Sequence, residues 1–319
     1  MRKKTSKSPW IFSLVILLIV LLYSGGLIGG VSTKDDPTDS STQINSSSSA
    51  DSPTLSSADS EANSSIGSES HHSMGSEPDT STDSQTSRQS STTNLATATL
   101  PSGKTEIILN RVGYTCSYNT DLLLPNWVGW TLSAEHTEGP YKRSGIPFHE
   151  DPDVSAPRVT TYDYSGSGYD RGHMCPSGDC RWSEEAQQQS FLMTNICPQN
   201  HNLNCGDWNE LEIACRRWAL RYGEIHIVCG PLLFNKQHKT IGKHKVTVPE
   251  AFYKVILRLT DEPEAIGFIF RNESGYKKIY SYVHSVDEVE RITGMNFFPN
   301  LQQPIQDDVE SRCDITQWN

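Results

Sequence analysis

Apolar and polar residues alternate along several short stretches in the C-terminal two thirds of the chain, a pattern typical of half-buried β-strands. Strands are expected at Glu106 to Asn119 (one or two strands), Trp127 to Ala134, Ile225 to Cys229, Phe252 to Leu259 and Ala265 to Phe270. Pro125 and Asn126 predict a turn before the second of these, and Phe191 to Asn195 predicts a further short strand. The last two strands are expected to pair as a hairpin.

Other stretches repeat their apolar residues with the period of a helix. Asp207, followed three residues later by Glu210, resembles a capping box with Asp in the cap position. Apolar residues then recur along one helical face: Trp208, Leu211, Cys215, Trp218, Ala219 and Tyr222. A second capped helix is expected from Ser285 to Gly294, and a short one from Glu184 to Phe191. Strands interleaved with a few helices predict a mixed α+β fold.

Hydropathy divides the 319-residue chain into three parts, the first of which is residues 1–31. Trp10 to Val31 carries no charge, and a helix of 22 residues would span about 33 Å, one bilayer core. The positive charges before it predict a membrane anchor whose N-terminus stays in the cytoplasm while the rest is periplasmic or extracellular. The small residues Ser24, Gly25 and Gly26 permit the alternative of a cleaved signal peptide, which would secrete the domain, although no Ala-x-Ala-like site is present.

Residues 32–100 are rich in Ser, Thr, Asp, Glu, Asn and Gln and are almost free of large apolar side chains. They cannot bury enough surface to offset chain entropy, so a disordered spacer is expected, with recruitment of a partner as the alternative. Residues 101–319 carry all eight cysteines and most aromatics, as one globular domain does. The net charge of −11 argues mildly against a protein that coats nucleic acid, although a catalytic site needs only a local basic groove.

The stretch from 169 to 212 collects the candidate chemistry of the chain. It begins with Asp-Arg-Gly-His at 170–173, continues with Thr-Asn-Ile-Cys-Pro-Gln at 194–199, and ends with Leu-Asn-Cys-Gly-Asp-Trp-Asn-Glu-Leu-Glu at 203–212. This one stretch therefore contains the side chains needed to bind a phosphate, a divalent metal and a water molecule.

Four residues of this stretch, together with Arg216 just after it, suit such chemistry individually. His173 is the candidate general base, because an imidazole titrates near neutrality. Arg171 would share a strand face with it and suits phosphate oxygens. The amide oxygen of Asn204 can bind a hard cation such as Mg²⁺. Glu212 and Arg216, four residues apart on the expected helix, lie on one face and can pair.

Together, these motifs resemble those of the DNA/RNA non-specific endonucleases of the ββα-metal superfamily, which includes the Serratia-type secreted nuclease and mitochondrial endonuclease G. The resemblance extends more loosely from Tyr114 to Phe298. It implies a ββα-metal nuclease fold, with a central antiparallel sheet flanked by helices. It also implies a metal-dependent endonuclease that hydrolyses DNA or RNA with little sequence preference. Asn195 would orient the site.

The same resemblance assigns the chemistry to the other motif residues. His173 would activate the attacking water, Asn204 would be the direct protein ligand of one Mg²⁺ (for which Mn²⁺ can substitute), and Glu212 would orient metal-bound water. Arg216 and Arg171 would hold the phosphate or its developing charge. In-line attack then gives a 5′-phosphate and a 3′-hydroxyl. A surface-tethered binding protein that keeps the fold without activity is the alternative, which the intact set of motif residues argues against.

A basic stretch of the otherwise acidic domain is the candidate for gripping the substrate. Its lysines are Lys236, Lys239, Lys243 and Lys245. A solvated loop explains such a stretch equally well. The expected partners are the DNA or RNA backbone, which carries no base code, and a membrane at the N-terminal helix. A homodimer and an inhibitor protein stay open as further partners.

Cysteines lie inside or between the motifs, at Cys175, Cys180, Cys197 and Cys205. A zinc site is disfavoured because the chain has no Cys-x-x-Cys pair. An even count in an exported domain suggests disulfides, and we expect Cys175 to bridge Cys197. A nucleophilic Cys175 with His173 as its base is disfavoured, because residues two apart on a strand are rarely within hydrogen-bond reach.

Overall fold

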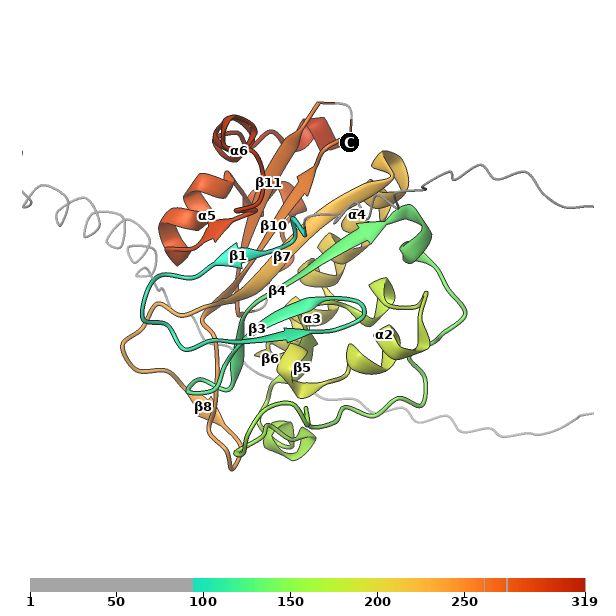
Figure 1. Cartoon of the computed structure of the whole chain (residues 1–319). Helices are drawn as coiled ribbons and strands as arrows, with labels where there is room; N and C mark the ends of the chain where they lie inside the picture. The colour runs from blue at the N-terminus through green and yellow to red at the C-terminus, as the bar shows by residue number, and fades with distance from the viewer. Residues whose placement is uncertain (1–93, 261, 274, 319) are drawn as a thin grey trace, which may run out of the picture. The chain divides into compact units, whose positions relative to one another are not determined.

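The computed structural model describes residues 94–260, 262–273 and 275–318, which fold around a seven-stranded antiparallel sheet (Figure 1). From one edge to the other its strands are β12 (Val283–His284), β11 (Glu264–Arg271), β10 (Ala251–Arg258), β7 (Glu224–Leu232), β4 (Leu124–Ser133), β3 (Thr115–Asn119) and β2 (Ile107–Asn110). Three two-stranded sheets accompany it: β1 (Ala98–Thr99) with β13 (Asn296–Phe297), β5 (Asp170–His173) with β6 (Ile196–Gln199), and β8 (Thr240–Ile241) with β9 (Val246–Thr247).

Helices cover both faces of the large sheet. They are α2 (Glu184–Gln189), α3 (His201–Cys205), α4 (Asp207–Tyr222), α5 (Val286–Thr293) and α6 (Gln303–Glu310). Short 3-10 helices connect the elements: η1 (Ala134–Thr137), η2 (Thr161–Tyr164), η3 (Ser177–Asp179), η4 (Met193–Asn195), η5 (Ile279–Tyr282) and η6 (Ile315–Trp318). The fold is therefore α+β with a central antiparallel sheet, as predicted.

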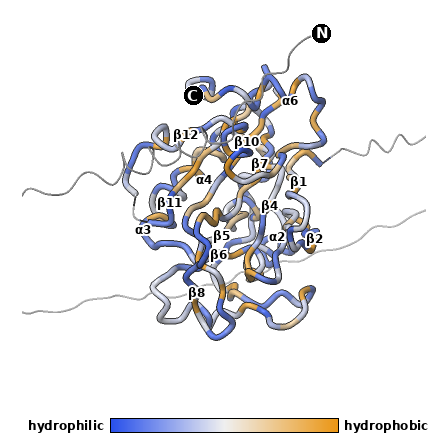
Figure 2. Tube along the Cα trace, turned by 90° about the vertical axis from the view of Figure 1, so that its left-hand side faces the viewer, coloured by the Kyte–Doolittle hydropathy of each residue, from blue (hydrophilic) through white to orange (hydrophobic). Residues whose placement is uncertain are grey.

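Alternation along the strands decides which side chains meet which layer. On β10, Phe252 and Ile256 join the core that includes α4 and the β5–β6 pair, whereas Val255 joins the core beneath α5 and α6. Figure 2 shows the hydrophobic positions gathered around β4, β7, β10 and α4 in the middle of the domain. The layer that holds the sequence motifs thus rests on one face of the sheet.

Most of the predicted elements are confirmed. The stretch 106–119 forms two strands, and β10 and β11 pair as a hairpin from Ala251 opposite Arg271 to Arg258 opposite Glu264. The helix predicted from 207 is α4, whose buried face carries every one of the predicted apolar residues. Ser285 caps α5, because its Oγ accepts a hydrogen bond from the backbone N–H of Glu288 at 3.2 Å.

Three local predictions are wrong. Pro125 and Asn126 lie inside β4, at a register shift against β3 where a proline without an N–H is tolerated, and not in a turn. Residues 191–195 form no strand, because η4 occupies the end of this segment and β6 begins only at Ile196. Asp207 is the first residue of α4 and not its cap, since its carboxylate accepts hydrogen bonds from Tyr276 and Tyr282 instead.

The folded domain begins before residue 101, where the sequence placed its boundary. Ala98 pairs with Phe297 across β1 and β13, and both Ala96 and Ala98 are buried. The close approach needs Gly129, where an added Cβ would come within 1.9 Å of the carbonyl oxygen of Ala96. The predicted membrane span within residues 1–31 and the spacer up to residue 93 lie outside the described residues. Among the described residues, no helix has the length and apolar character needed to cross a membrane.

Candidate active site

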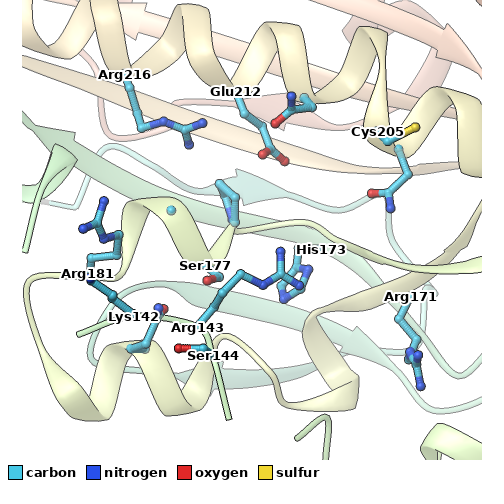
Figure 3. A pocket seen from close by; sticks show the side chains of 15 residues that line it. Lys142, Arg143, Ser144, Arg171, His173, Ser177, Arg181, Cys205, Glu212 and Arg216 are labelled. Carbon is cyan, nitrogen blue, oxygen red and sulfur yellow. The ribbon is translucent and has the colours of Figure 1, made fainter. Parts of the chain in front are cut away.

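A pocket of about 770 Å³ opens where β5, α3 and α4 meet two loops of the chain (Figure 3). Five residues from the predicted site line it: Arg171, His173, Asn204, Glu212 and Arg216. The two loops add Lys142, Arg143, Ser144, Pro176, Ser177, Gly178 and Arg181. Figure 3 shows Glu212 and Arg216 extending from α4 toward the wall that carries His173, Arg143 and Ser177.

His173 ends strand β5, whose pairing with β6 places it opposite Ile196. Its ring packs edge-on against Phe191, with 5.1 Å between centroids, and tilted against Phe148, at 5.2 Å. The Nε2 atom is buried and has no hydrogen-bond partner among the described residues. Burial, and secondarily the positive charge of Arg143, hold the pKa of His173 below its usual value. The imidazole is therefore neutral at physiological pH and able to accept a proton.

Asn204 lies on α3, two residues before Gly206, which separates α3 from α4. Its Nδ2 donates to Asp170 Oδ2 at 2.9 Å, which fixes the amide and leaves the acceptor Oδ1 without a partner among the described residues. His201 shares the same carboxylate oxygen, also at 2.9 Å. An oriented, free amide oxygen in a water-accessible pocket fits a Mg²⁺ ion, which prefers oxygen ligands and keeps most of its waters.

Glu212 is half-buried one helical turn before Arg216 on the pocket side of α4. Burial raises the pKa of Glu212 to about 7, although the nearby positive charge of Lys254 opposes this shift. Its carboxylate is the only one among the lining residues that the structure describes. Glu212 is therefore the group in the pocket whose charge changes near neutral pH.

The position of Arg216 on the helix predicted an ion pair with Glu212, but Arg216 pairs with Asp179 instead. Its Nη1 binds the buried carboxylate of Asp179 at 2.8 Å, with the Arg216 side chain 22% exposed and that of Asp179 1% exposed. Trp130 Nε1 donates to the other oxygen of Asp179 at 3.1 Å. The ion pair ties α4 to η3, and so fixes the guanidinium at the wall of the pocket.

Arg171 and Asn195 differ from the expectation in where they point. Arg171 lines the pocket, but its guanidinium donates to Thr161 and stacks 4.8 Å from the Phe148 ring, away from Glu212 and Arg216 (Figure 3). Asn195 is fully buried and outside the pocket lining. Its amide accepts from the backbone N–H of Cys175 at 2.9 Å and donates to the Cys175 carbonyl at 2.8 Å, so it clamps the chain just after His173.

Cations that the sequence reading missed complete the pocket. Lys142, Arg143 and Arg181 line it from the two loops, and Arg143 comes close enough to His173 to lower its pKa. They belong to no recognisable motif, so only their folding against β5 and α4 reveals them. The result is a strongly basic pocket in a protein of net charge −11. The lysines Lys236, Lys239, Lys243 and Lys245 are exposed outside this pocket.

The predicted bridge between Cys175 and Cys197 is wrong, and both thiols are free. Pairing of β5 with β6 places Cys197 opposite Gly172, three residues before Cys175. The sulfur near Cys175 is that of Cys180, at 3.7 Å. A nucleophilic role for Cys175 is also disfavoured, because burial holds the pKa of its thiol well above the usual range and the residue lies outside the pocket lining.

Comparison with known proteins points to nucleases. The profile of the family described as DNA/RNA non-specific endonuclease matches residues 91–303. Mitochondrial nuclease EXOG of Xenopus laevis is 33% identical over 64% of this chain and 61% of its own length. Nuclease C1 of Cunninghamella echinulata is 36% identical over 62% of this chain and 85% of its own. The chain spans about three fifths of the length of the curated EXOG relatives it matches.

The fold has a counterpart among solved structures. A chain in the crystal structure of the EndoG/EndoGI complex, which describes the mechanism of EndoG inhibition, matches with a TM-score of 0.59 and 28% identity. The match covers 61% of this chain and 87% of that one. The predicted ββα-metal nuclease fold is thereby confirmed, and β5, β6 and the helices that follow them carry the residues of the pocket.

Proposed function

The chain belongs to the DNA/RNA non-specific endonuclease family, and from that membership we propose that it is a Mg²⁺-dependent endonuclease that hydrolyses phosphodiester bonds of DNA or RNA. The observation that carries the proposal is the meeting of His173, Asn204 and Glu212 in one basic pocket. A base, an ion-binding oxygen and a carboxylate come from three different elements, so their convergence is a property of the fold and not of one short motif.

In this proposal, each group acts through the geometry described above. The neutral imidazole of His173 takes a proton from the attacking water, while the Asn195 clamp holds the chain behind it. Asn204 would hold the ion through Oδ1, and Glu212 would accept a hydrogen bond from water beside it. Arg216, fixed by Asp179, holds a phosphate oxygen. When bound, Mg²⁺ supplies positive charge where negative charge builds on the phosphate and on the leaving 3′-oxygen.

Hydrolysis in line then leaves a 5′-phosphate and a 3′-hydroxyl. An anionic phosphate beside His173 would raise the pKa of that imidazole, offsetting the burial and the Arg143 charge that lower it in the free protein. Substrate binding would thus bring the base closer to the range in which proton transfer is efficient. Mn²⁺ would substitute for Mg²⁺, since both accept oxygen ligands.

Contacts to the backbone would give the low sequence preference, because phosphates carry no base code. Arg143, Lys142 and Arg181 extend the basic surface from the pocket. The lysines of residues 236–245 would contact the strand farther away. Among these lysines, Lys239 contacts a residue close to the site. Its Nζ lies 4.7 Å from the ring centroid of Tyr169, which precedes Asp170 in the chain.

The composition of the N-terminal residues supports a proposal about location. The uncharged stretch Trp10 to Val31 would anchor the protein in a membrane, and residues 32–93 would tether the domain outside the cytoplasm. Cleavage of the leader would secrete the domain instead. Fractionation of cells with an antibody against the domain separates these outcomes, because a cleaved protein leaves the membrane fraction.

The decisive test compares the purified wild-type protein with His173→Ala and Asn204→Ala on double-stranded DNA and on RNA. Each substitution is expected to reduce the rate by at least about 100-fold, one by removing the base and the other by removing the ion ligand. EDTA should abolish wild-type cleavage and Mg²⁺ should restore it. Intact plasmid and intact RNA after incubation of wild-type protein with Mg²⁺ would leave the inactive binding protein as the surviving explanation.

A cysteine-dependent hydrolase is tested by alkylation, but Cys205 complicates the result. This exposed thiol lines the pocket next to Asn204, so a bulky adduct there would block the site sterically (Figure 3). Cys205→Ser removes the complication. We expect this variant to keep its activity after alkylation and to lose it in EDTA, the reverse of what a cysteine nucleophile requires.

A further inference from the structure

Lys254 is a buried lysine that the proposed chemistry leaves without a role. It lies in the middle of β10, a strand buried along its whole length, and its side chain is completely inaccessible. Its Nζ has no hydrogen-bond partner among the described residues. An ammonium group removed from water without partners is strongly destabilising, so its charge must be balanced by something nearby.

The immediate contacts of Lys254 are aromatic. Its Nζ lies 4.3 Å from the ring centroid of Trp208 on α4 and 5.2 Å from that of Trp130 on β4. Such contacts stabilise an ammonium group by less than its removal from water costs. Its strand neighbours, Cys229 on β7 and Phe268 on β11, offer no charge either. The two rings therefore stabilise the ammonium group partly, through cation–π contacts, but do not neutralise its charge.

The carboxyl groups that act on Lys254 are Glu212 and Asp179, which lie at or beside the pocket. β10 turns Lys254 to the same face as Phe252 and Ile256, the face covered by α4. Trp208 lies four residues before Glu212 on that helix, hence on the same side. Trp130 donates its indole N–H to Asp179, the partner of Arg216. One aromatic contact of Lys254 thus leads to Glu212 in the pocket lining, and the other leads to Asp179, which holds Arg216 at the pocket wall.

The charge balance of this region supports the same reading. Burial lowers the pKa of Lys254, but Cys229, Cys215, Glu212 and Asp179 more than offset that effect. Burial raises the pKa of both thiols to about 12, so they are neutral at physiological pH and cannot balance a cation there. That leaves Glu212 and Asp179. With Arg216 and Lys254 they form a set of two cations and two carboxyl groups, in which Glu212 gains its negative charge only as the pH rises through about 7.

We propose that Lys254 is a positioning residue of the active site, supplying the buried positive charge against which Glu212 and Asp179 keep their negative charges; this inference rests on the function proposed above. Lys254 touches neither substrate nor ion. It acts through Glu212, which accepts a hydrogen bond from water more strongly when it is ionised, and through Asp179, whose negative charge holds Arg216.

The consequence is a defined pH dependence. The pKa of Glu212 is about 7 with Lys254 in place. Besides Lys254, the charged groups that act on Glu212 are Asp179 from η3 and Arg216 from α4. The pocket lining adds the cations Lys142, Arg143 and Arg181, while the guanidinium of Arg171 points away toward Thr161 and Phe148. Loss of Lys254 removes a positive charge, so Glu212 binds its proton more tightly and becomes neutral at a higher pH. Cleavage should then fail first on the acid side.

The test measures cleavage of DNA by the full chain with Mg²⁺ between about pH 5 and pH 10 for wild type, Lys254→Met and Lys254→Arg. In Lys254→Met the acid limb should move up by about one pH unit, with roughly tenfold less activity on that limb and near recovery at alkaline pH. Lys254→Arg keeps the charge and should keep the limb near its wild-type position. Ile256→Val, a packing defect on the same face, should lower stability without moving the limb. An unmoved limb in Lys254→Met would overturn the proposal.

A reciprocal measurement needs neither activity nor a change in the core. In a chain carrying ¹³C at the lysine Cε atoms, Glu212→Gln should shift the titration of Lys254 to lower pH, because coupling between two charges acts equally on both. This readout separates the two proposals. If the wild-type protein cleaves nothing, the proposed function fails while the Lys254 coupling can still be measured. If Lys254 titrates identically with and without Glu212, the coupling fails whatever the activity.

Discussion

The residues that act in the pocket depend on second partners that hold their polar atoms in one orientation. Asn204 is the clearest case, because its Nδ2 is bound by Asp170 and only Oδ1 remains for an ion. Such outer partners of a ligand usually matter for affinity by one to two orders of magnitude. The side chain of Asp170 is therefore as much part of the proposed ion site as Asn204 itself.

We predict that Asp170→Ala raises the Mg²⁺ concentration needed for half-maximal cleavage by roughly 10- to 100-fold, because the freed amide of Asn204 can rotate. A Mg²⁺ titration of the cleavage rate measures this. His201→Ala is the matched control, since His201 binds the same oxygen of Asp170 but its side chain is 72% exposed. Equal Mg²⁺ requirements in Asp170→Ala and wild type would contradict the ion site described above.

The sequence predicted which residues line the pocket where they belong to a contiguous motif. It did not predict those that reach the pocket through contacts between distant parts of the chain. His173, Asn204 and Glu212 were found because they stand in recognisable strings. Arg143 was missed because its loop has no pattern of its own. The partner of Arg216 was misjudged, because helical spacing predicts neighbours on the same helix and says nothing of Asp179 on η3.

Among the elements, helix α4 organises the site, and its first residue anchors a segment far away in sequence. The buried carboxylate of Asp207 accepts hydrogen bonds from the backbone N–H of Tyr276 at 2.9 Å and from the hydroxyl of Tyr282. The approach is so close that a Cβ at position 275 would lie 1.9 Å from Asp207 Oδ2, which explains the glycine there. The sequence pattern located this helix correctly but misread Asp207 as its cap.

Asp207→Ala is expected to destabilise the fold by roughly 2–4 kcal/mol, because it removes a buried charged acceptor and leaves the donors of Tyr276 and Tyr282 unsatisfied. Urea unfolding measures the loss, and amide hydrogen exchange should increase at Tyr276. Glu210→Ala tests the general effect of an acid in the first turn, since Glu210 is exposed three residues later. A similar small loss in both variants would mean that Asp207 stabilises only the helix end.

Strand boundaries were less predictable than the helix for a physical reason. Alternation gave the core strands β7, β10 and β11, whose side chains meet a buried layer on each face. Alternation failed at 191–195, where Asn195 is a buried polar residue. Its amide donates hydrogen bonds to the carbonyl oxygens of Cys175 and Ser190. A residue selected for such a clamp leaves no period in the sequence.

At the scale of the whole molecule, charge is distributed unevenly over the two layers that flank the sheet. Cations gather around the pocket beside α4, whereas acids gather between α5 and α6 on the opposite layer. There Asp287, Glu290 and Glu310 have carboxylate oxygens within 4.8 Å of one another. Burial, and then the neighbouring Glu290, raise the pKa of Glu310 to about 8. Repulsion among these carboxylates, which lie away from the active site, makes the stability of the domain depend on pH.

The sign of that sensitivity follows from proton binding. The folded state keeps a proton on Glu310 that the unfolded chain releases above its ordinary pKa, near 4.3, so stability is greatest below that pH and falls as pH rises toward about 8. Glu310→Gln removes the titrating group while retaining most of its shape. Thermal unfolding in EDTA should give a melting temperature about 2–4 °C above wild type at alkaline pH, and no gain near pH 4. Glu138→Gln, an exposed change of the same charge, should show no such pH-dependent gain. A gain of equal size at both pH values would mean that improved packing, and not charge, accounts for the effect.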